Sequence, residues 1–262
     1  KNRNRSRKYK TSEIYMTKYT GCCGKGAAFC CALFFSAALF AGSPEAAEKY
    51  IEERHLDWSY IQKAETELLE VLKTEPENLK ANLLMSRVCL FKGEKTENND
   101  EKIKLYDKAA SFGKIAIKIN PKSADAHFYY SAGIGRNAQL KGIFNALGMV
   151  GEIKAEMDKT VELDPKHVIG LNALAQYYME LPGIFGGSIE KTEELLLKAK
   201  ELDPNLSMTY VTLGKMYLRQ GKRDKAKEAL ETVIKMKNPS KPAYYALDDL
   251  PDAQRLLKDI KE

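Results

Sequence analysis

The sequence predicts an all-α fold, a right-handed solenoid of stacked antiparallel helix pairs, and two observations carry this prediction. Prolines close successive amphipathic runs with spacings of 45, 44, 39 and 35 residues, at Pro76, Pro121, Pro165, Pro204 and Pro239. Between these prolines the apolar residues recur with helical rather than alternating periodicity. A period of this length in helical segments is typical of repeat proteins, in which each repeat is one helix pair.

Each expected element follows from this pattern. In chain order, the expected helices are Ala46–His55 and a run through Ala64 and Leu68, then Ala81–Phe91 and Ile103–Ile119, then Ala126–Gln139 and Glu152–Leu163, then Leu171–Tyr178 and a run through Leu196 and Ala199, and finally a pair through Tyr210 and Leu230. Pro251–Lys261 reads as a closing helix with proline in its first turn, where a missing N–H is tolerated. We therefore expect about five degenerate repeats and a capping helix.

The last repeat is the most regular. Tyr210, Leu213, Gly214 and Tyr217 have the spacing W-x2-L-G-x2-Y, and Ala226 and Leu230 follow on the partner helix. A small residue lets two helix axes approach closely while larger neighbours fill the groove. Over roughly residues 44–262 the chain resembles the tetratricopeptide repeat (TPR) family.

The first 42 residues differ from the repeats in charge and hydropathy. Residues 1–25 carry eight Lys or Arg and one Glu, so they account for the chain's net charge of +6, and the remainder sums to −1. Residues 26–42 contain no charged residue. A basic segment before a short apolar run and small residues is typical of a secretory signal peptide. We expect a signal peptide or N-terminal anchor over 1–42, one TPR-like domain over 43–262, and an exported, periplasmic or envelope-associated protein that meets membranes only through an uncleaved leader.

Charge and motifs argue against several function classes. The near-neutral repeat region gives no reason to expect nucleic-acid binding. Four of the five cysteines lie in the leader, and the three histidines fall in different repeats, so we expect no metal site. Gly133, Gly135 and Ala138 match a dinucleotide fingerprint, but they lie within an expected helix, where close helix packing explains them better. We expect no cofactor and no enzymatic activity.

The function class that remains is non-catalytic binding by the shape of the solenoid. The first helix of each pair is expected to line the concave face, with Phe128 and Arg136 from one repeat, Asn172, Gln176 and Met179 from the next, and Lys215 and Arg219 from the third. Arg136 and Arg219 are candidate clamps for an acidic group, or they bond neighbouring glutamates. Two apolar insertions, with Phe144 in one and Ile184 and Phe185 in the other, either wall a pocket or pack together as core.

A closer resemblance rests on the ordered segments Arg136–Gly142, Glu152–Glu156, Val161–Pro165 and Tyr178–Ser188. They look like the bacterial TRAP-transporter-associated TPR component. This resemblance implies a non-catalytic envelope adaptor that partners a periplasmic solute-binding protein, forms homo-oligomers, and serves uptake of small hydrophobic solutes. The alternatives are a general TPR scaffold for envelope proteins, a carrier of a hydrophobic small molecule, and the related eukaryotic microtubule-associated TPR type, which the exported-looking leader disfavours.

Overall fold

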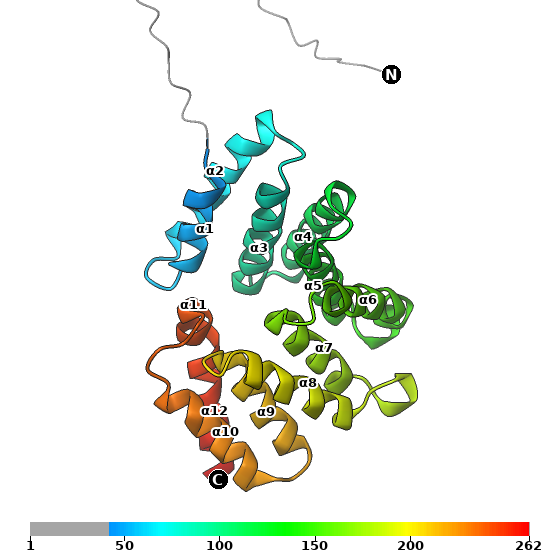
Figure 1. Cartoon of the computed structure of the whole chain (residues 1–262), viewed down its shortest axis with the longest axis vertical. Coiled ribbons are helices and arrows are strands. Elements are labelled where there is room, and N and C mark those ends of the chain that lie inside the picture. Colours follow the sequence, from blue (N-terminus) through cyan, green and yellow to red (C-terminus); the bar gives the residue numbers. More distant parts are fainter. Residues whose placement is uncertain (1–41, 262) are drawn as a thin grey trace, which may run out of the picture. The chain divides into compact units, whose positions relative to one another are not determined.

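The computed structural model describes residues 42–261, apart from the side chains of residues 143–147 and 261, and the segment 1–41 that holds the predicted leader lies outside it. Within the described range the chain forms helices and no strand (Figure 1). The helix pairs are α1 (Pro44–Glu52) with α2 (Ser59–Thr74), α3 (Leu79–Lys95) with α4 (Asn99–Ile119), α5 (Ala124–Lys141) with α6 (Ile143–Leu163), α7 (Val168–Glu180) with α8 (Ile189–Leu202), and α9 (Ser207–Arg219) with α10 (Arg223–Lys235). The all-α, TPR-like prediction is confirmed.

The prolines mark the turns between pairs. A side-chain cap begins the next helix two residues after each of the first three prolines, from Asn78, Ser123 and His167. Each cap accepts a hydrogen bond from a backbone N–H in the first turn, which would otherwise lack a partner. The proline ends one pair and the capping residue starts the next, so the period seen in the sequence is the repeat itself.

Glycines set how closely successive repeats approach. A Cβ added to Gly133 on α5 would lie 2.5 Å from the backbone nitrogen of Ala110 on α4, and one added to Gly113 on α4 would lie 2.6 Å from the backbone nitrogen of Tyr130 on α5. The two backbones therefore touch at both points. This confirms close helix packing as the role of Gly133, the first glycine of the fingerprint-like motif.

Two stretches that lengthen their repeats lie largely in helices. The apolar stretch Gly142–Gly151 forms the start of α6, which is 21 residues long, because Gly142 at a φ of 84° turns the chain within a single residue. Most of the polar stretch Gly93–Asp100 likewise belongs to α3 and α4. The extra residues of these repeats therefore lengthen α3, α4 and α6 and extend the surface that the helices present inside the stack.

The closing helix begins earlier than expected. Proline in a first turn is found at Pro242, where α11 (Pro242–Tyr244) starts, and the chain continues through a π-helical turn, η2 (Tyr245–Asp249), into α12 (Leu250–Lys261). Pro251 lies inside this continuous helix and has no N–H to donate to the Leu247 carbonyl oxygen. The wider π turn just before Pro251 accommodates that lost hydrogen bond. Pro251 therefore lies within the closing helix and does not mark its start.

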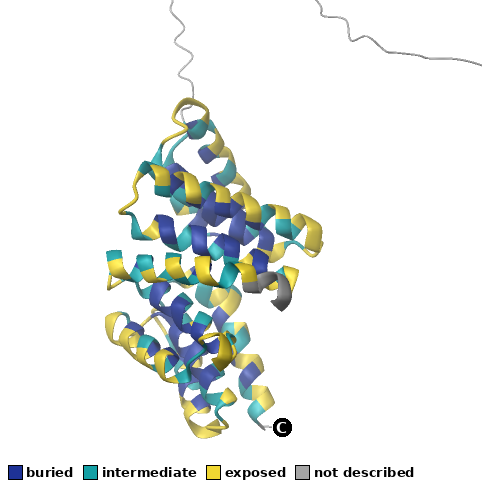
Figure 2. Cartoon of the chain, turned by 90° about the vertical axis from the view of Figure 1, so that its right-hand side faces the viewer, coloured by how far each residue is buried: buried dark blue, intermediate teal, exposed yellow. Residues whose placement is uncertain are grey.

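In the second, fourth and fifth repeats the first helix is buried more than the second, and Figure 2 shows buried stretches inside the stack and exposed ones over its surface. The inner helices α3 and α9 are buried on most sides, whereas the outer helix α10 buries one stripe of Ala226, Ala229, Leu230 and Val233. Such a stripe is what an amphipathic outer helix presents to the core. No helix in the described part of the chain has the length and apolar character needed to cross a membrane.

Candidate functional site

The first helices of three successive repeats line a half-open pocket of about 420 Å³. Its wall repeats the same spacing on each helix: Arg87, Phe91 and Glu94 on α3, Phe128, Ala132 and Gly135 on α5, and Ile169, Ala173 and Gln176 on α7. Residues four and seven apart share one helix face, so each helix turns one stripe toward the same space. Val150, Ile153 and Met157 of α6 add an apolar side.

The pocket carries a few charged groups that are already paired. Arg136 on α5 donates to a Glu94 carboxylate oxygen on α3 at 3.0 Å, and Arg87 donates to Glu52 at 2.8 Å. Protein surrounds the Glu94 carboxylate on most sides although water still reaches it, and this burial raises its pKa against the opposing effect of Arg136. The paired charges leave the apolar wall as the dominant feature.

Aromatic side chains shape the rest of the wall. Phe128 and Tyr129 meet edge to face with ring centroids 5.0 Å apart, and the Tyr177 hydroxyl donates to the Val150 carbonyl oxygen at 3.3 Å. Burial raises the pKa of Tyr129, so its hydroxyl stays protonated at neutral pH. Apolar walls with a few oriented polar groups can bind an apolar side chain or small molecule and fix its orientation.

Three residues predicted from the sequence line this pocket: Phe128, Arg136 and Gln176. The Arg136 guanidinium donates to Glu94, in agreement with the alternative that this arginine bonds a neighbouring glutamate. The side chain of Phe144 lies outside the described residues.

Asn172 and Met179 lie in the core instead. Asn172 is fully buried, and its amide donates to the Val168 carbonyl oxygen and to the Thr209 hydroxyl, both at 3.0 Å. Met179 belongs to the cluster between α7, α8 and α9. Neither side chain lines the pocket, because the pocket face of α7 runs through Ile169, Ala173 and Gln176, and of the predicted stripe only Gln176 lies on it.

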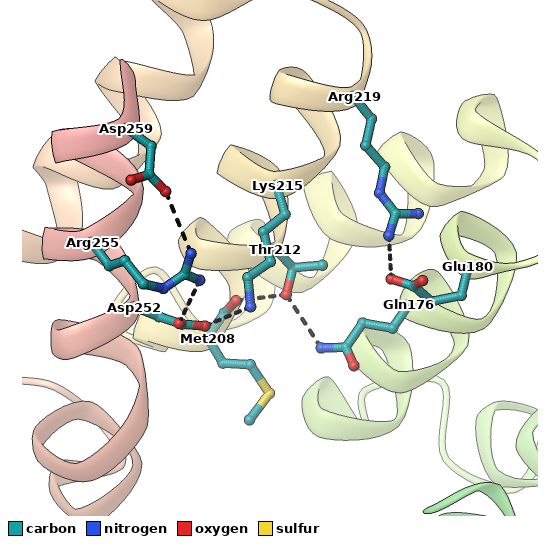
Figure 3. A network of polar contacts seen from close by, with 9 residues as sticks. All are labelled: Gln176, Glu180, Met208, Thr212, Lys215, Arg219, Asp252, Arg255 and Asp259. Carbon is teal, nitrogen blue, oxygen red and sulfur yellow. Dashed lines mark hydrogen bonds and ion pairs between the residues drawn. The ribbon is translucent and has the colours of Figure 1, made fainter. Parts of the chain in front are cut away.

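Lys215 and Arg219 form links between helices (Figure 3). Lys215 donates to Asp252 of α12 at 2.6 Å, and Arg219 donates to the Glu180 carboxylate at 2.6 Å and to the Met179 carbonyl oxygen. Gln176 reaches the Thr212 hydroxyl at 3.4 Å. These groups tie the last repeats together, and neither Lys215 nor Arg219 belongs to the pocket wall.

The second insertion is an exposed turn. Ile184 and Phe185 lie in η1 (Gly183–Phe185), a short 3₁₀ turn, and they are 87% and 42% exposed. Neither contributes to the pocket wall, to which the first insertion contributes Val150. Leu181, at the start of the second insertion, does line the pocket, so the two insertions share it through Val150 and Leu181, whereas Ile184 and Phe185 neither line it nor lie in the core.

Sequence reasoning missed several wall residues, among them Arg87, Glu94, Tyr129 and Tyr244. A signal for the first two existed: positions 87, 91 and 94 of α3 match positions 128, 132 and 135 of α5 in spacing. No signal in the sequence places Tyr244, which comes from α11 and meets the pocket only through the fold. Among the described residues, no group of three or more His, Cys, Asp or Glu is arranged to hold a metal ion.

Solved structures with this architecture are TPR proteins. The Thermus thermophilus TPR protein TTC0263 superposes with a TM-score of 0.62 and 16% identity, over 83% of this chain and 100% of that one. PilW, described as a type IV pilus biogenesis factor, gives a TM-score of 0.52 and 16% identity, over 83% of this chain and 92% of that one. At such low identity these matches show the fold alone.

Sequence relatives are more specific. Regulator of microtubule dynamics protein 1 of Mus musculus is 28% identical over 141 residues, which is 48% of this chain and 46% of that protein. Regulator of microtubule dynamics protein 3 of Bos taurus is 22% identical over 180 residues, 63% of this chain and 38% of that protein. The alignments thus span less than half the length of these relatives. The model of the family described as "Regulator of microtubule dynamics protein 1-3" matches residues 50–258, and the chain belongs to this family.

Proposed function

We propose that this chain is a non-catalytic protein-interaction scaffold whose internal pocket receives an apolar side chain from a partner protein, in a process that controls microtubule dynamics. The observation that carries the proposal is the pocket itself. Three inner helices direct one stripe each into a space of about 420 Å³, its apolar part formed by Phe91, Phe128, Ala132, Ile169 and Ala173, and charged pairs edge it. The names of the relatives supply the process.

The charges near the pocket favour a partner segment of mixed character. Arg136 and Glu94 pair with each other across the wall, so an incoming segment meets one cation and one anion close together. An apolar anchor flanked by polar groups suits this arrangement, because binding energy concentrates in a desolvated centre and orientation comes from the edge.

The test is to fill the pocket without disturbing the fold. A Cβ at Gly135 meets no atom within 4 Å and points into the pocket, so Gly135→Leu adds a side chain there. Gly151→Leu is the matched control, since Gly151 is an exposed α6 glycine with equal room that does not line the pocket. Both changes replace a helical glycine and favour the helix by up to about 1 kcal/mol.

Cross-linking in the native cell, followed by mass spectrometry, would compare the wild-type protein with these two variants. We expect tubulin or microtubule-associated proteins to be captured by the wild type and by Gly151→Leu, and lost from Gly135→Leu. Equal capture by all three proteins would overturn the role of the pocket. Capture that never includes a microtubule component would overturn the process.

A second hypothesis is the TRAP-type transport adaptor, together with export to the periplasm or envelope. Its support is the ordered resemblance over Arg136–Ser188 and the basic, apolar leader. The relatives and structures named above carry no transporter description. The same cross-linking experiment separates the two hypotheses, because capture of a solute-binding protein by the wild type, lost on filling the pocket, would favour transport.

A further inference from the structure

Three residues of the pocket wall carry hydrogen-bond donors and lie close together. They are Arg87 of α3, Tyr129 of α5 and Tyr244 of α11. The Tyr244 ring meets Phe91 edge to face with centroids 5.7 Å apart, and the Arg87 guanidinium carbon lies 6.0 Å from the same Phe91 centroid. Arg87 is also near enough to both tyrosines for its charge to oppose the effect of burial on the pKa of each hydroxyl. The three side chains therefore meet at one part of the wall.

The two tyrosine hydroxyls are donors without an acceptor. Burial raises the pKa of Tyr129 and of Tyr244, and the Arg87 charge opposes this only in part, so both hydroxyls keep their protons at neutral pH. Neither hydroxyl forms a hydrogen bond with any residue that the structure describes. A partly buried donor that lacks a protein partner gains free energy when a ligand supplies an acceptor.

Arg87 has unused donors as well. An arginine guanidinium carries several N–H groups, and the hydrogen bond that Arg87 makes within the described range runs from Nη2 to a Glu52 carboxylate oxygen at 2.8 Å. Its Nε is buried and has no partner among the described residues, and the residue as a whole is 7% exposed. A buried cation whose hydrogen bonds are incomplete is stabilised by a further anion beside it.

Positive charge is in excess around these donors. Glu52 pairs with Arg87 at 2.8 Å and also with Lys241 at 3.7 Å. Arg54 is 2% exposed, and within the part of the chain that the structure describes it forms no ion pair and its Nη2 has no hydrogen-bond partner. Burial lowers the pKa of Arg54 and the charge of Arg87 lowers it further, whereas Asp248 acts in the opposite direction without bonding to it. Three cations thus have one carboxylate as their bonded partner.

The rest of the same pocket is suited to an apolar group. The walls from α6 and α7 include Ile153, Met157, Ile169 and Ala173. A volume of about 420 Å³ is at the lower end of the range for small-molecule sites, which gives room for a few side chains. Because the pocket is half open, a protruding segment of another protein can reach the apolar walls and the donors together.

We propose that Arg87, Tyr129 and Tyr244 form an anion subsite that binds a carboxylate of the partner protein, an Asp or Glu side chain next to the apolar residue that fills the pocket. The inference rests on the proposed function, because it names a second group of the partner at the same pocket. Carboxylate oxygens accept several hydrogen bonds, so one carboxylate can accept from the guanidinium and from both hydroxyls. It also brings the negative charge that this part of the protein lacks.

The test uses the full chain and short peptides. A phage-displayed library with a central leucine or phenylalanine and random flanking residues is selected on the wild-type protein, and we expect Asp or Glu to be enriched beside the fixed residue. The strongest acidic peptide is then synthesised together with its amide form, which has Asn or Gln in place of the acidic residue. Fluorescence anisotropy should show the acidic peptide binding at least about tenfold more tightly, since a hydrogen bond to a charged group contributes about that factor.

The decisive variant is the double change Tyr129→Phe and Tyr244→Phe, which keeps both rings and removes both hydroxyls. It should lose most of the preference for the acidic peptide and bind the amide form much as the wild type does. The matched control is the double change Tyr210→Phe and Tyr217→Phe. Its hydroxyls donate to the Pro204 carbonyl oxygen and to Glu193 and lie outside the pocket wall, so the preference should remain.

Equal binding of the two peptides by the wild type, or an unchanged preference in the variant without hydroxyls, would overturn the subsite. Selected peptides without acidic residues, together with binding to phosphatidylserine vesicles that this variant loses, would assign the subsite to a lipid headgroup and overturn the partner carboxylate. Gly135→Leu separates the subsite from the pocket. Binding of both peptides that survives this change would count against the pocket and thus the proposed function, whereas binding that it abolishes, with no preference in the wild type, would count against the subsite alone.

Discussion

The last repeat and the third repeat each have a glycine on the inner helix, but the two glycines contact different helices. Gly214 of α9 lies against the Leu230 side chain of its own partner helix α10, as the repeat pattern predicts. Gly133 of α5 lies against the backbone of Ala110 on α4, which belongs to the preceding repeat. In the regular repeat the glycine brings the two helices of the same repeat together. In the degenerate repeat it brings α5 close to the preceding repeat, and another face of α5 lines the pocket. Departure from the repeat pattern thus coincides with the pocket.

The largest expected effect breaks the backbone contact of the degenerate repeat. Gly133→Ala places a methyl group 2.5 Å from a backbone nitrogen that cannot rotate away, so we expect a loss of about 2–4 kcal/mol in the free energy of unfolding. Gly135→Ala, two residues away with open space, should gain up to about 1 kcal/mol from helix propensity. Urea unfolding followed by circular dichroism measures both. Equal effects of the two changes would show that α4 and α5 are not packed as described.

The next effect concerns Asp249, which joins the regular repeat to the C-terminal helix. Burial raises the pKa of this carboxyl to about 6, against the opposing effect of the Ser207 hydrogen bond. A folded-state pKa above the ordinary 3.8 means that the folded protein binds the proton more tightly, so the associated stability is present below about pH 4 and is lost as the pH rises through 6.

Asp249→Asn removes this ionisation while leaving an oxygen to accept from Ser207. At pH 7.5 we expect the variant to be more stable by about 2 kcal/mol, and at pH 4 to match the wild type. Thermal unfolding at the two pH values gives the comparison. A variant that is less stable than the wild type at pH 7.5 would mean that the ionised carboxylate is a net stabiliser of this junction.

A smaller loss is expected in the regular repeat. In Gly214→Ala the new methyl group meets only the Leu230 side chain, at 2.7 Å, and leucine can adopt another rotamer. We expect a loss of about 1 kcal/mol, clearly less than that of Gly133→Ala. The same urea titration ranks the two. If Gly214→Ala proves the more damaging, side-chain packing within a repeat outweighs backbone contact between repeats.

The sequence was sufficient for the helix pairs because their signals are local. Pro76 with Asn78, or Pro121 with Ser123, specifies a helix end and the next helix start within a few residues. The face of α7 that meets the pocket was not predictable in this way. This helix is apolar on most sides, so periodicity cannot tell its pocket stripe from its core stripe.

The polar residue Asn172 of α7 also could not be placed from the sequence. A lone amide on an apolar helix suggests an open face, but here its Nδ2 donates to the Val168 carbonyl and the Thr209 hydroxyl in the core, and its Oδ1 is buried without a partner among the described residues. The contact of Tyr244 with Phe91 joins segments far apart in the chain, and no pattern within either segment predicts it. Local signals thus define repeats, and long-range packing defines the site.

The smallest effects on stability separate two arginines that look alike in the sequence. Arg136 pairs with Glu94 and Arg219 pairs with Glu180, and both arginine side chains are close to half exposed. Both glutamates line the pocket, but of the two arginines only Arg136 does. Exposed pairs contribute little, so each change to alanine should cost less than about 1 kcal/mol. Arg136→Ala removes the wall cation and leaves Glu94 without its partner, which should raise the pKa of Glu94 further and weaken partner capture. Arg219→Ala keeps every side chain of the pocket wall, so it should weaken capture less, and equal losses in both variants would mean that capture does not depend on the Arg136 cation in particular.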